Sequence, residues 1–257
     1  MNLLQSVILG AVEGITEFLP VSSTGHLILV SAWMGLHGEA VKTFSIVIQA
    51  GALVAVLGLY GRRLGSPQML RNLVVGFLPA GVAGLLLHRW VKEHLFGTHP
   101  VAVALAVGGL FMIGLDRWLR RDRSGRGTSP SRGLETLGAG EAFMIGLVQC
   151  LALWPGTSRS MVTISAALLL GLSAPAAAEF SFLLALPTLG AATLFDAAKN
   201  GDGLLQAASL PVLAAGFAVA AVTAVLAMRG LVATLNRRGL APFGWYRLGL
   251  ALAVFFR

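Results

Sequence analysis

Residues 12–26 read "VEGITEFLPVSSTGH" and stand out in an otherwise apolar chain. Glu13 and Glu17 lie one helical turn apart, and Pro20, three hydroxyl residues and His26 follow them. A carboxylate at the depth of a bilayer costs roughly 3 kcal/mol or more, so such residues usually mark a functional site. The polar segment is therefore a candidate functional site, and its residue types should indicate the chemistry.

The composition is that of an integral membrane protein. Of the 257 residues, 56% are hydrophobic and 12% are charged, and the mean hydropathy is +0.80. A soluble domain carries about 25% charged residues. The net charge of +8 suggests a nucleic-acid partner, but the arginines cluster between apolar spans, as the positive-inside rule predicts for cytoplasmic loops. We therefore expect no nucleic-acid partner and place 61–72, 117–137 and 229–238 in the cytoplasm.

Six apolar spans are predicted, and two further regions behave differently. The spans cover about 44–60, 73–88, 101–116, 178–198, 207–228 and 243–256. Residues 3–35 and 141–172 are each interrupted near the middle, at "FLPVSSTGH" and "LWPGTSRS". Each half is too short to cross a bilayer, so we predict two re-entrant helical hairpins, buried in protein or lining a wet cavity. The predicted fold class is all-α, a polytopic integral membrane protein.

The two interrupted regions resemble each other, which indicates an internal duplication. "GAVEG" at 10–14 matches "GLVQC" at 146–150, and "FS" at 44–45 and 180–181 keeps the same offset of 136. If one gap is allowed, Pro20 pairs with Pro155 and Ser23 with Ser158. Three spans in the first half force the second repeat to insert upside down, with both termini outside and a polar site at the repeat interface. We expect a single membrane domain, 1–257, divided into repeat 1 (1–118), a flexible basic cytoplasmic loop (119–138) and repeat 2 (139–257).

The two glutamates are expected to share a helix face, because residues four apart are neighbours there. Like charges repel and burial adds to the cost, so a divalent cation, an arginine or a shared proton must compensate. The plain alternative is that one carboxylate caps a nearby backbone group. Because Mg²⁺ and Ca²⁺ prefer oxygen ligands, we predict that Glu13 and Glu17 hold one of these ions.

Both interruptions have the features of an anion-binding helix start. Pro20 ends the first half-helix, and three suitable N-cap residues precede a second helix predicted to start near His26. Free N–H groups and the positive dipole end there favour phosphate. "PGTSRS" at 155–160 repeats this device and adds Arg159, whose planar fork matches phosphate geometry; a snorkelling arginine is the alternative. The candidate substrate-binding residues are Ser22, Thr24, Gly156, Thr157, Ser158, Arg159 and Ser160.

Together these groups predict the binding and hydrolysis of a phosphate ester or anhydride. Arg159 and the helix ends would hold phosphoryl oxygens and stabilise charge in the transition state. Ser23 or His26 would be the nucleophile, with Glu17 or His26 as the base. The candidate catalytic residues are therefore Glu17, Ser23, His26 and Arg159.

With "EGITEFLPVSSTGH", "KTFSIVIQAG" at 42–51 and "PGTSRSMVT", the chain resembles the undecaprenyl-diphosphate phosphatase family of the bacitracin-resistance type over nearly its full length. The resemblance implies removal of one phosphate from undecaprenyl diphosphate, which recycles the lipid carrier for peptidoglycan synthesis and confers bacitracin resistance. It also implies dependence on a divalent cation (Mg²⁺ or Ca²⁺) and a site that opens to the outer, periplasmic face of the bacterial plasma membrane.

By position, Glu13 and Glu17 match the family's paired acidic motif, Ser23 and His26 its serine and histidine, and Arg159 the arginine of its second motif. Met161 departs from the glycine that the family usually has after Ser-Arg-Ser, which puts the close backbone approach beside Ser160 in doubt. The resemblance does not settle whether Ser23 or His26 attacks phosphorus, and we favour Ser23.

A transporter or flippase for a polyprenyl phosphate is the main alternative, because inverted repeats are typical of carriers. A carrier would use Arg159 and the helix ends for binding but would need no nucleophile. A second lipid-phosphatase superfamily requires a histidine downstream of its arginine, and Ser165 stands at that position. The expected partners are a polyprenyl diphosphate lipid and membrane lipids, and the sequence leaves a homodimer open.

Overall fold

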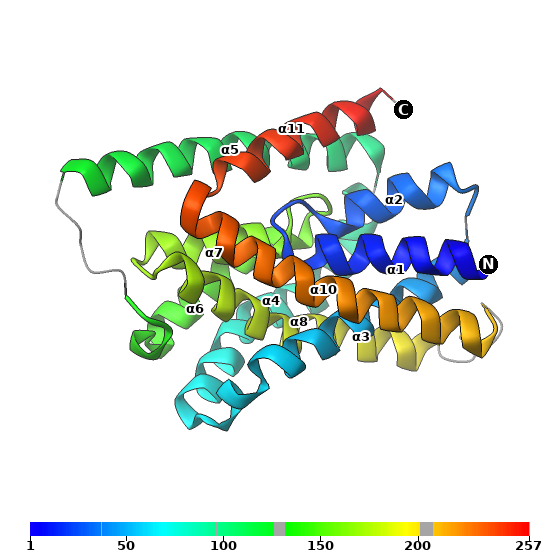
Figure 1. The fold of residues 1–257 in the computed structure, drawn as a ribbon, viewed down its shortest axis with the longest axis horizontal. Helices are drawn as coiled ribbons and strands as arrows, with labels where there is room; N and C mark the ends of the chain where they lie inside the picture. Colours follow the sequence, from blue (N-terminus) through cyan, green and yellow to red (C-terminus); the bar gives the residue numbers. More distant parts are fainter. Residues whose placement is uncertain (37, 96, 126–131, 201–207, 257) are drawn as a thin grey trace.

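A computed structural model of the chain describes residues 1–36, 38–95, 97–125, 132–200 and 208–256 (Figure 1). This described part is helical, and its one extended pairing is an isolated bridge between Arg132 and Leu172. By length and composition, five of its helices can cross a membrane: Thr43–Gly65, Pro67–Leu87, Thr98–Arg121, Ala174–Phe195 and Leu210–Arg238. The prediction of an all-α polytopic membrane protein is confirmed.

Both interrupted regions form a pair of short helices joined by a turn. In the first pair, α1 spans Leu3–Phe18 and α2 spans Ser23–Trp33. In the second, α6 spans Ala139–Gln149, a 3-10 turn spans Cys150–Leu153, and α7 spans Arg159–Leu169. Figure 1 shows that the pairs enter from opposite ends of the long axis and that their turns lie near its middle. This arrangement is the one expected of two hairpins inserted with opposite topology.

Six further helices of the described part overlap the six predicted spans. They are α3 (Glu39–Tyr60), α4 (Pro67–His94), α5 (Thr98–Gly125), α8 (Ala174–Asn200), α10 (Leu210–Arg238) and α11 (Ala241–Phe255). The last of them, α11, has 15 residues and is not among the five that are long enough to cross a membrane. The prediction of a loop at 229–238 is wrong, because α10 continues through it. Residues 119–125 of the predicted loop 119–138 also belong to a helix, α5, while 126–131 lie outside the described residues. Near the C-terminal ends of α5 and α10, Arg120 of α5 donates to Asp116 at 2.8 Å and to the carbonyl of Arg238 at 2.5 Å. The second of these bonds connects α5 to α10.

Each hairpin packs against a long helix of the other half of the chain. Helix α1 lies along α10, and α6 lies along α4. A Cβ atom on Gly10 would collide with the Gly216 carbonyl, and one on Gly146 would collide with the Gly76 carbonyl. Lipid offers no hydrophobic drive for helices to associate, so close packing at small residues holds such interfaces together. Because Gly10 and Gly146 are also matched in the sequence, these paired contacts support the predicted duplication.

The equivalence of the two turns differs from the sequence alignment. Ser22 and Ser158 are both N-caps, and both have φ 73°. The offset of 136 therefore holds without a gap at the caps, and the pairing of Ser23 with Ser158 is wrong. Ser23 corresponds instead to Arg159, so the two repeats place a hydroxyl and a guanidinium at equivalent positions.

Arg132 links the two helices of the second hairpin at the end away from its turn, where α6 begins and α7 finishes. Arg132 donates to Glu141 at 2.6 Å and to the Leu170 carbonyl at 3.2 Å. Its hydrogen bond to Glu141 holds the pKa of that carboxyl below its usual range. Arg132 thereby joins the start of α6 to the end of α7.

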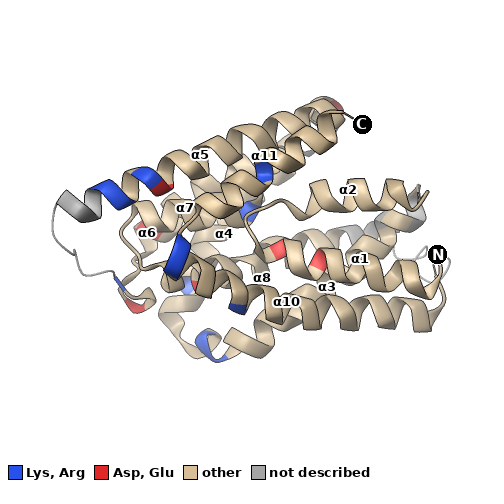
Figure 2. Cartoon of the chain, turned by 45° about the horizontal axis from the view of Figure 1, so that its top comes forward, with Lys and Arg blue, Asp and Glu red and all other residues tan. Residues whose placement is uncertain are grey.

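The distribution of side chains matches a membrane environment. Large apolar residues such as Leu85 and Leu86 of α4 are 77% exposed, whereas Glu13, Glu17 and Arg159 are buried. Figure 2 shows Lys and Arg gathered at the end of the molecule where α5 and α10 finish, and both chain termini lie at the opposite end. The positive-inside rule would place the basic end in the cytoplasm.

Candidate active site

Each hairpin turn contains a serine in the left-handed region of backbone conformation. Apart from glycines, Ser22 and Ser158 alone have positive φ in the described part of the chain. Ser22 Oγ accepts the Gly25 N–H at 3.4 Å, and Ser158 Oγ accepts the Met161 N–H at 3.3 Å. The predicted start of the second helix near His26 is therefore wrong by one turn, because Ser22 caps a helix that begins at Ser23. Strain of this kind in a non-glycine residue is uncommon and clusters at functional sites.

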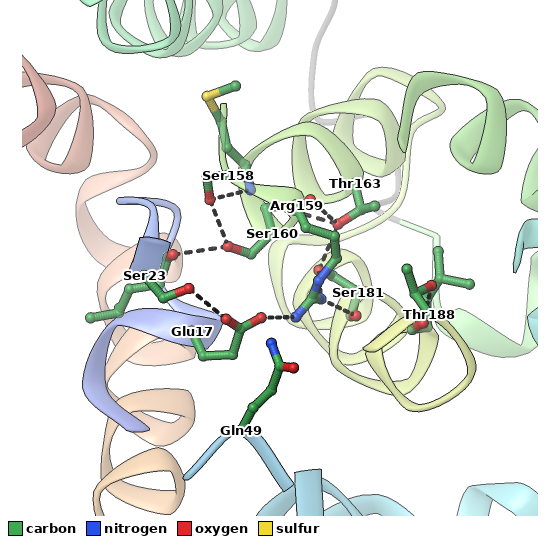
Figure 3. Close-up of polar contacts among 12 residues, drawn as sticks. Glu17, Ser23, Gln49, Ser158, Arg159, Ser160, Thr163, Ser181 and Thr188 are labelled. Carbon is green, nitrogen blue, oxygen red and sulfur yellow. Dashed lines mark hydrogen bonds and ion pairs between the residues drawn. The ribbon is translucent and has the colours of Figure 1, made fainter. Parts of the chain in front are cut away.

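Glu17 joins the two hairpins, as Figure 3 shows. Its Oε2 accepts a hydrogen bond from Ser23 Oγ at 2.6 Å, and its Oε1 accepts one from Arg159 Nη2 at 3.1 Å. The side chains of Glu17 and Arg159 are only 6% and 8% exposed. A hydroxyl, a carboxylate and a guanidinium that sequence analysis singled out thus converge in a protected place.

Arg159 is oriented by a second set of contacts from α8. Its Nη1 donates to the carbonyl of Ser181 at 2.7 Å and to its hydroxyl at 3.3 Å, and that hydroxyl also pairs with Thr163 Oγ1 at 2.7 Å. The guanidinium carbon lies 5.7 Å from the centroid of the Phe18 ring, within the range of a cation–π contact. Its Nε is buried and has no hydrogen-bond partner in the described structure. The arginine is therefore held in place with one donor free for an oxyanion.

Ser160 connects the second turn directly to the first. Its Oγ donates to the Leu19 carbonyl at 2.9 Å and lies 3.1 Å from Ser158 Oγ. A hydroxyl has one proton, so Ser158 must be the donor within the serine pair. Met161 is buried, and its sulfur lies beside Gly108 of α5. The departure from the family's glycine is thus accommodated by α5 and leaves the turn at Ser160 intact.

His26 lies apart from this cluster. Its Nδ1 is 2.7 Å from the Ser22 carbonyl oxygen, and its Nε2 is 2.7 Å from the hydroxyl of Tyr246 on α11. No described contact joins His26 to Glu17 or Ser23. The structure therefore brings together three of the four candidate catalytic residues and directs the fourth elsewhere.

The other candidate binding residues have different surroundings. Thr24 is exposed and Thr157 is half-buried, and no side-chain hydrogen bond is described for either hydroxyl. Gly156 has φ 95°, and a Cβ atom there would lie 2.7 Å from the Val101 carbonyl oxygen. Glycine is required at this position both for the backbone conformation and for the close approach to α5.

Glu13 is the residue with the clearest capacity to hold a cation. It is 2% exposed, and its Oε2 has no hydrogen-bond partner among the described residues. Across the same residues, no group of three or more His, Cys, Asp or Glu side chains is placed to hold a metal ion. The protein thus offers carboxylates but not a full cage. This donor set fits Mg²⁺, which is commonly held by one or two carboxylates together with substrate phosphates and water.

Comparison with known proteins shows the family of the chain. Residues 6–253, which include every site residue described above, match the family described as Bacitracin resistance protein BacA. The chain belongs to the BacA family. It is 51% identical to the undecaprenyl-diphosphatase of Sorangium cellulosum, with 97% of this chain and 84% of the relative covered. The proteins of the same name from Nitrosospira multiformis (43% identity; 98% of this chain and 93% of the relative covered) and Geobacillus thermodenitrificans (40%; 100% and 98%) are similar over nearly their whole length.

Several site residues of this BacA-family protein were missed by sequence analysis. Arg247 is 0% exposed and donates to the carbonyls of Gly156 at 2.9 Å and Pro20 at 3.5 Å, so it holds both turns. Two further bonds reach the Ala104 carbonyl at 2.9 Å and the Leu105 carbonyl at 3.3 Å. A charge inside the predicted span 243–256 was the available signal, because intramembrane charges are expected to be functional.

The remaining missed residues come from helices that sequence analysis treated only as spans. Ser181 stands in one of the two matched "FS" pairs, which was read as a repeat signal and not as a site signal. Figure 3 shows the amide of Gln49, on α3, pointing toward the Glu17–Arg159 pair. Its oxygen accepts a hydrogen bond from Thr193 at 2.9 Å. Polar residues of α3 and α8 therefore border the site in addition to the two hairpins.

Proposed function

We propose that this BacA-family protein removes the terminal phosphate of undecaprenyl diphosphate, giving undecaprenyl phosphate and inorganic phosphate. The observation that carries the proposal is the position of Glu17 between Ser23 Oγ, at 2.6 Å, and Arg159, at 3.1 Å. A carboxylate bonded to a hydroxyl can act as a base, and a guanidinium beside it can bind phosphoryl oxygens. The names of the relatives support this choice of substrate.

In the proposed reaction, Ser23 Oγ attacks the terminal phosphorus while Glu17 accepts the hydroxyl proton. The bond between that phosphorus and the bridging oxygen breaks, and undecaprenyl phosphate leaves with the proton that Glu17 returns to it. A water then attacks the phosphoserine, giving one proton to Glu17 and its oxygen to phosphorus. Ser23 Oγ departs and recovers that proton, so the enzyme returns to its starting state.

The groups around Ser23 would stabilise the charge that spreads over the transferred phosphoryl oxygens. Arg159 has a buried Nε without a partner in the described structure, and its Nη2 can exchange Glu17 for a phosphate oxygen. The N-terminal ends of α2 and α7 add free N–H groups and positive dipole ends. In phosphoryl transfer such positioning and electrostatic stabilisation supply most of the catalysis.

A divalent cation is part of this proposal. Glu13 would hold Mg²⁺ or Ca²⁺ through its unpaired buried oxygen, with Glu17 nearby on the same face of α1. The bound ion would neutralise negative charge on the diphosphate. Removal of divalent cations should therefore weaken substrate binding even though the protein's own residues keep their positions.

We also propose a location in the bacterial inner membrane with the site open to the periplasmic side. The basic ends of α5 and α10 support this orientation, because the first hairpin enters from the opposite end of the molecule (Figures 1 and 2). The polyprenyl tail would remain in the bilayer while the diphosphate reaches the two turns. Product formed there would return the carrier lipid to cell-wall synthesis, and the description of the family supports a role in bacitracin resistance.

The test is phosphate release from undecaprenyl diphosphate by protein purified in detergent, with and without a chelator. Wild type should release phosphate only with Mg²⁺ or Ca²⁺, and Ser23→Ala should lose activity by about 10²-fold or more, because covalent catalysis needs the hydroxyl. Acid quenching should trap phosphate on wild-type protein but not on Ser23→Ala.

Ser45→Ala is a suitable control, because the Ser45 hydroxyl donates to the Val41 carbonyl of its own helix at 2.9 Å. It should keep wild-type activity. Lipid transfer across vesicles without any release of phosphate would instead establish the carrier, and full activity in Ser23→Ala would remove Ser23 from the mechanism.

A further inference from the structure

His26 and Tyr246 form a pair that the proposed reaction does not use. Their rings are stacked, with centroids 5.6 Å apart and planes inclined by 4°, and Tyr246 Oη lies 2.7 Å from His26 Nε2. The two residues are 220 positions apart and come from α2 and α11. Such a contact across the chain fixes an imidazole that would otherwise rotate freely about its side-chain bonds.

The hydrogen bonds of His26 determine which ring nitrogen carries a proton. The Ser22 carbonyl oxygen can only accept, so Nδ1, at 2.7 Å, must be the donor. In the neutral ring Nε2 then accepts from the Tyr246 hydroxyl. Both nitrogens are occupied, and neither is described in contact with Ser23. In this arrangement His26 is neither a nucleophile nor a base for Ser23.

His26 instead contacts the backbone of the first hairpin turn, through the carbonyl of Ser22. Ser22 has φ 73° and directly precedes Ser23, so the Ser22 carbonyl and the Ser23 hydroxyl share one short piece of backbone. Tyr246 is anchored in turn by its neighbour Arg247, which is fully buried and bonded to the Pro20 and Gly156 carbonyls. A continuous set of contacts therefore runs from α11 through Tyr246 and His26 to the backbone that carries Ser23.

We propose that Tyr246 is a positioning residue, which holds the His26 ring on the Ser22 carbonyl and so keeps the Ser23 hydroxyl aligned. This inference rests on the proposed function, because it assigns Tyr246 to the nucleophile of that reaction. It predicts that Tyr246 acts through His26 and that the two residues contribute to catalysis as a unit.

Tyr246→Phe removes the hydroxyl and keeps the stacked ring. Its kcat should fall about tenfold, on the scale of one well-placed hydrogen bond, with KM nearly unchanged because the nucleophile and not the substrate is misplaced. The chain offers a matched control in its only other tyrosine. Tyr60 packs against Phe182 with centroids 5.7 Å apart, and Tyr60→Phe should stay within about twofold of wild type.

A double-mutant cycle separates positioning from independent effects. If Tyr246 acts through His26, the Tyr246→Phe, His26→Ala double variant should match His26→Ala within about twofold, since coupled residues are not additive. Losses that multiply would overturn the proposal. A Tyr246→Phe variant with unchanged kcat would overturn it as well.

Nitrogen NMR of labelled histidine gives a readout that does not depend on activity. Wild type has five histidines, and both His26 and His94, whose Nδ1 lies 3.0 Å from the Trp90 carbonyl oxygen, should give signals of the Nδ1–H form. The signals that vanish in His26→Ala identify the His26 ring. Tyr246→Phe should shift the Nε2 signal of that ring, and Tyr60→Phe should not. An Nε2–H form for His26, or an unshifted signal, would refute the inference even if phosphate release confirmed the function. Absent phosphate release with the expected shift would instead refute the function alone.

Discussion

Glu17 has two partners, and their competition sets the resting state of the site. The carboxylate is bonded to Ser23 and to Arg159, and both members of the ion pair are buried. An isolated buried charge is far more costly than a paired one. Glu17 therefore stabilises the guanidinium before substrate arrives, and phosphate can take over that role because it carries the same sign of charge.

Glu17→Gln tests both roles of this carboxylate. The variant keeps the shape but leaves Arg159 without a counter-charge, so the free energy of unfolding should fall by about 3 kcal/mol. Phosphate release should fall by about 10²- to 10⁴-fold, because the base is lost. Thermal unfolding in detergent and the phosphate assay measure the two effects.

Glu179→Gln is the matched control for that change. Glu179 pairs with Arg63 at 2.6 Å, but the Arg63 side chain is 52% exposed, and such pairs contribute about 0–1 kcal/mol. Equal losses of stability in the two variants would contradict the account of the buried pair.

Sequence analysis found the residues of the site better than it found their partners. Glu17, Ser23 and Arg159 were predicted because charged residues and hydroxyl clusters are rare at membrane depth. The contact of His26 with Tyr246 was missed, because nothing in the sequence pattern relates positions that far apart. His26 was therefore interpreted as a catalytic group, whereas its described contacts are with a carbonyl and a tyrosine.

At the scale of elements, the hairpins depend on glycines that let helices approach closely. Gly216 on α10 faces α1 and α3, and a Cβ atom there would meet Phe44 and Ser6. Packed interfaces tolerate added methyl groups poorly, so Gly216→Ala should lower the free energy of unfolding by about 1–3 kcal/mol. Unfolding in detergent, followed by circular dichroism, gives the measurement.

Gly230, on the same helix, has open space where a Cβ atom would stand. Gly230→Ala should leave stability unchanged or raise it by up to about 1 kcal/mol, because alanine favours the helix. A loss in Gly230→Ala as large as that in Gly216→Ala would show that glycine is needed for α10 itself and not for its contact with the first hairpin.

Helix boundaries were the weakest part of the sequence prediction. Apolar periodicity ends where the arginines begin, so 119–125 and 229–238 were assigned to loops. In the structure, α5 and α10 continue past their apolar segments. Charged side chains at these ends hold each other, as Arg120 does with Asp116, and hydropathy does not register such contacts.

At the scale of the whole molecule, the two ends of the long axis differ in charge. Basic side chains gather where α5 and α10 end, and the chain termini lie at the other end (Figures 1 and 2). The first hairpin starts and finishes at the end with the termini, and the second at the basic end. A diphosphate on the periplasmic side would therefore meet the α1–α2 hairpin first and Arg159 of the second hairpin at the centre.

Cysteine labelling in intact cells tests this orientation, and the chain suits it because Cys150 is its single cysteine. In a Cys150→Ser background, Trp33→Cys places a thiol at the end of α2, where the native side chain is 70% exposed. Asn236→Cys places one among the exposed residues near the end of α10. A membrane-impermeant maleimide should label Trp33→Cys in intact cells, and Asn236→Cys only after permeabilisation, because the arginines beside it hold that end inside. The reverse pattern would place the first hairpin in the cytoplasm and contradict a periplasmic site, while labelling of both variants in intact cells would show that α10 does not cross the membrane as proposed.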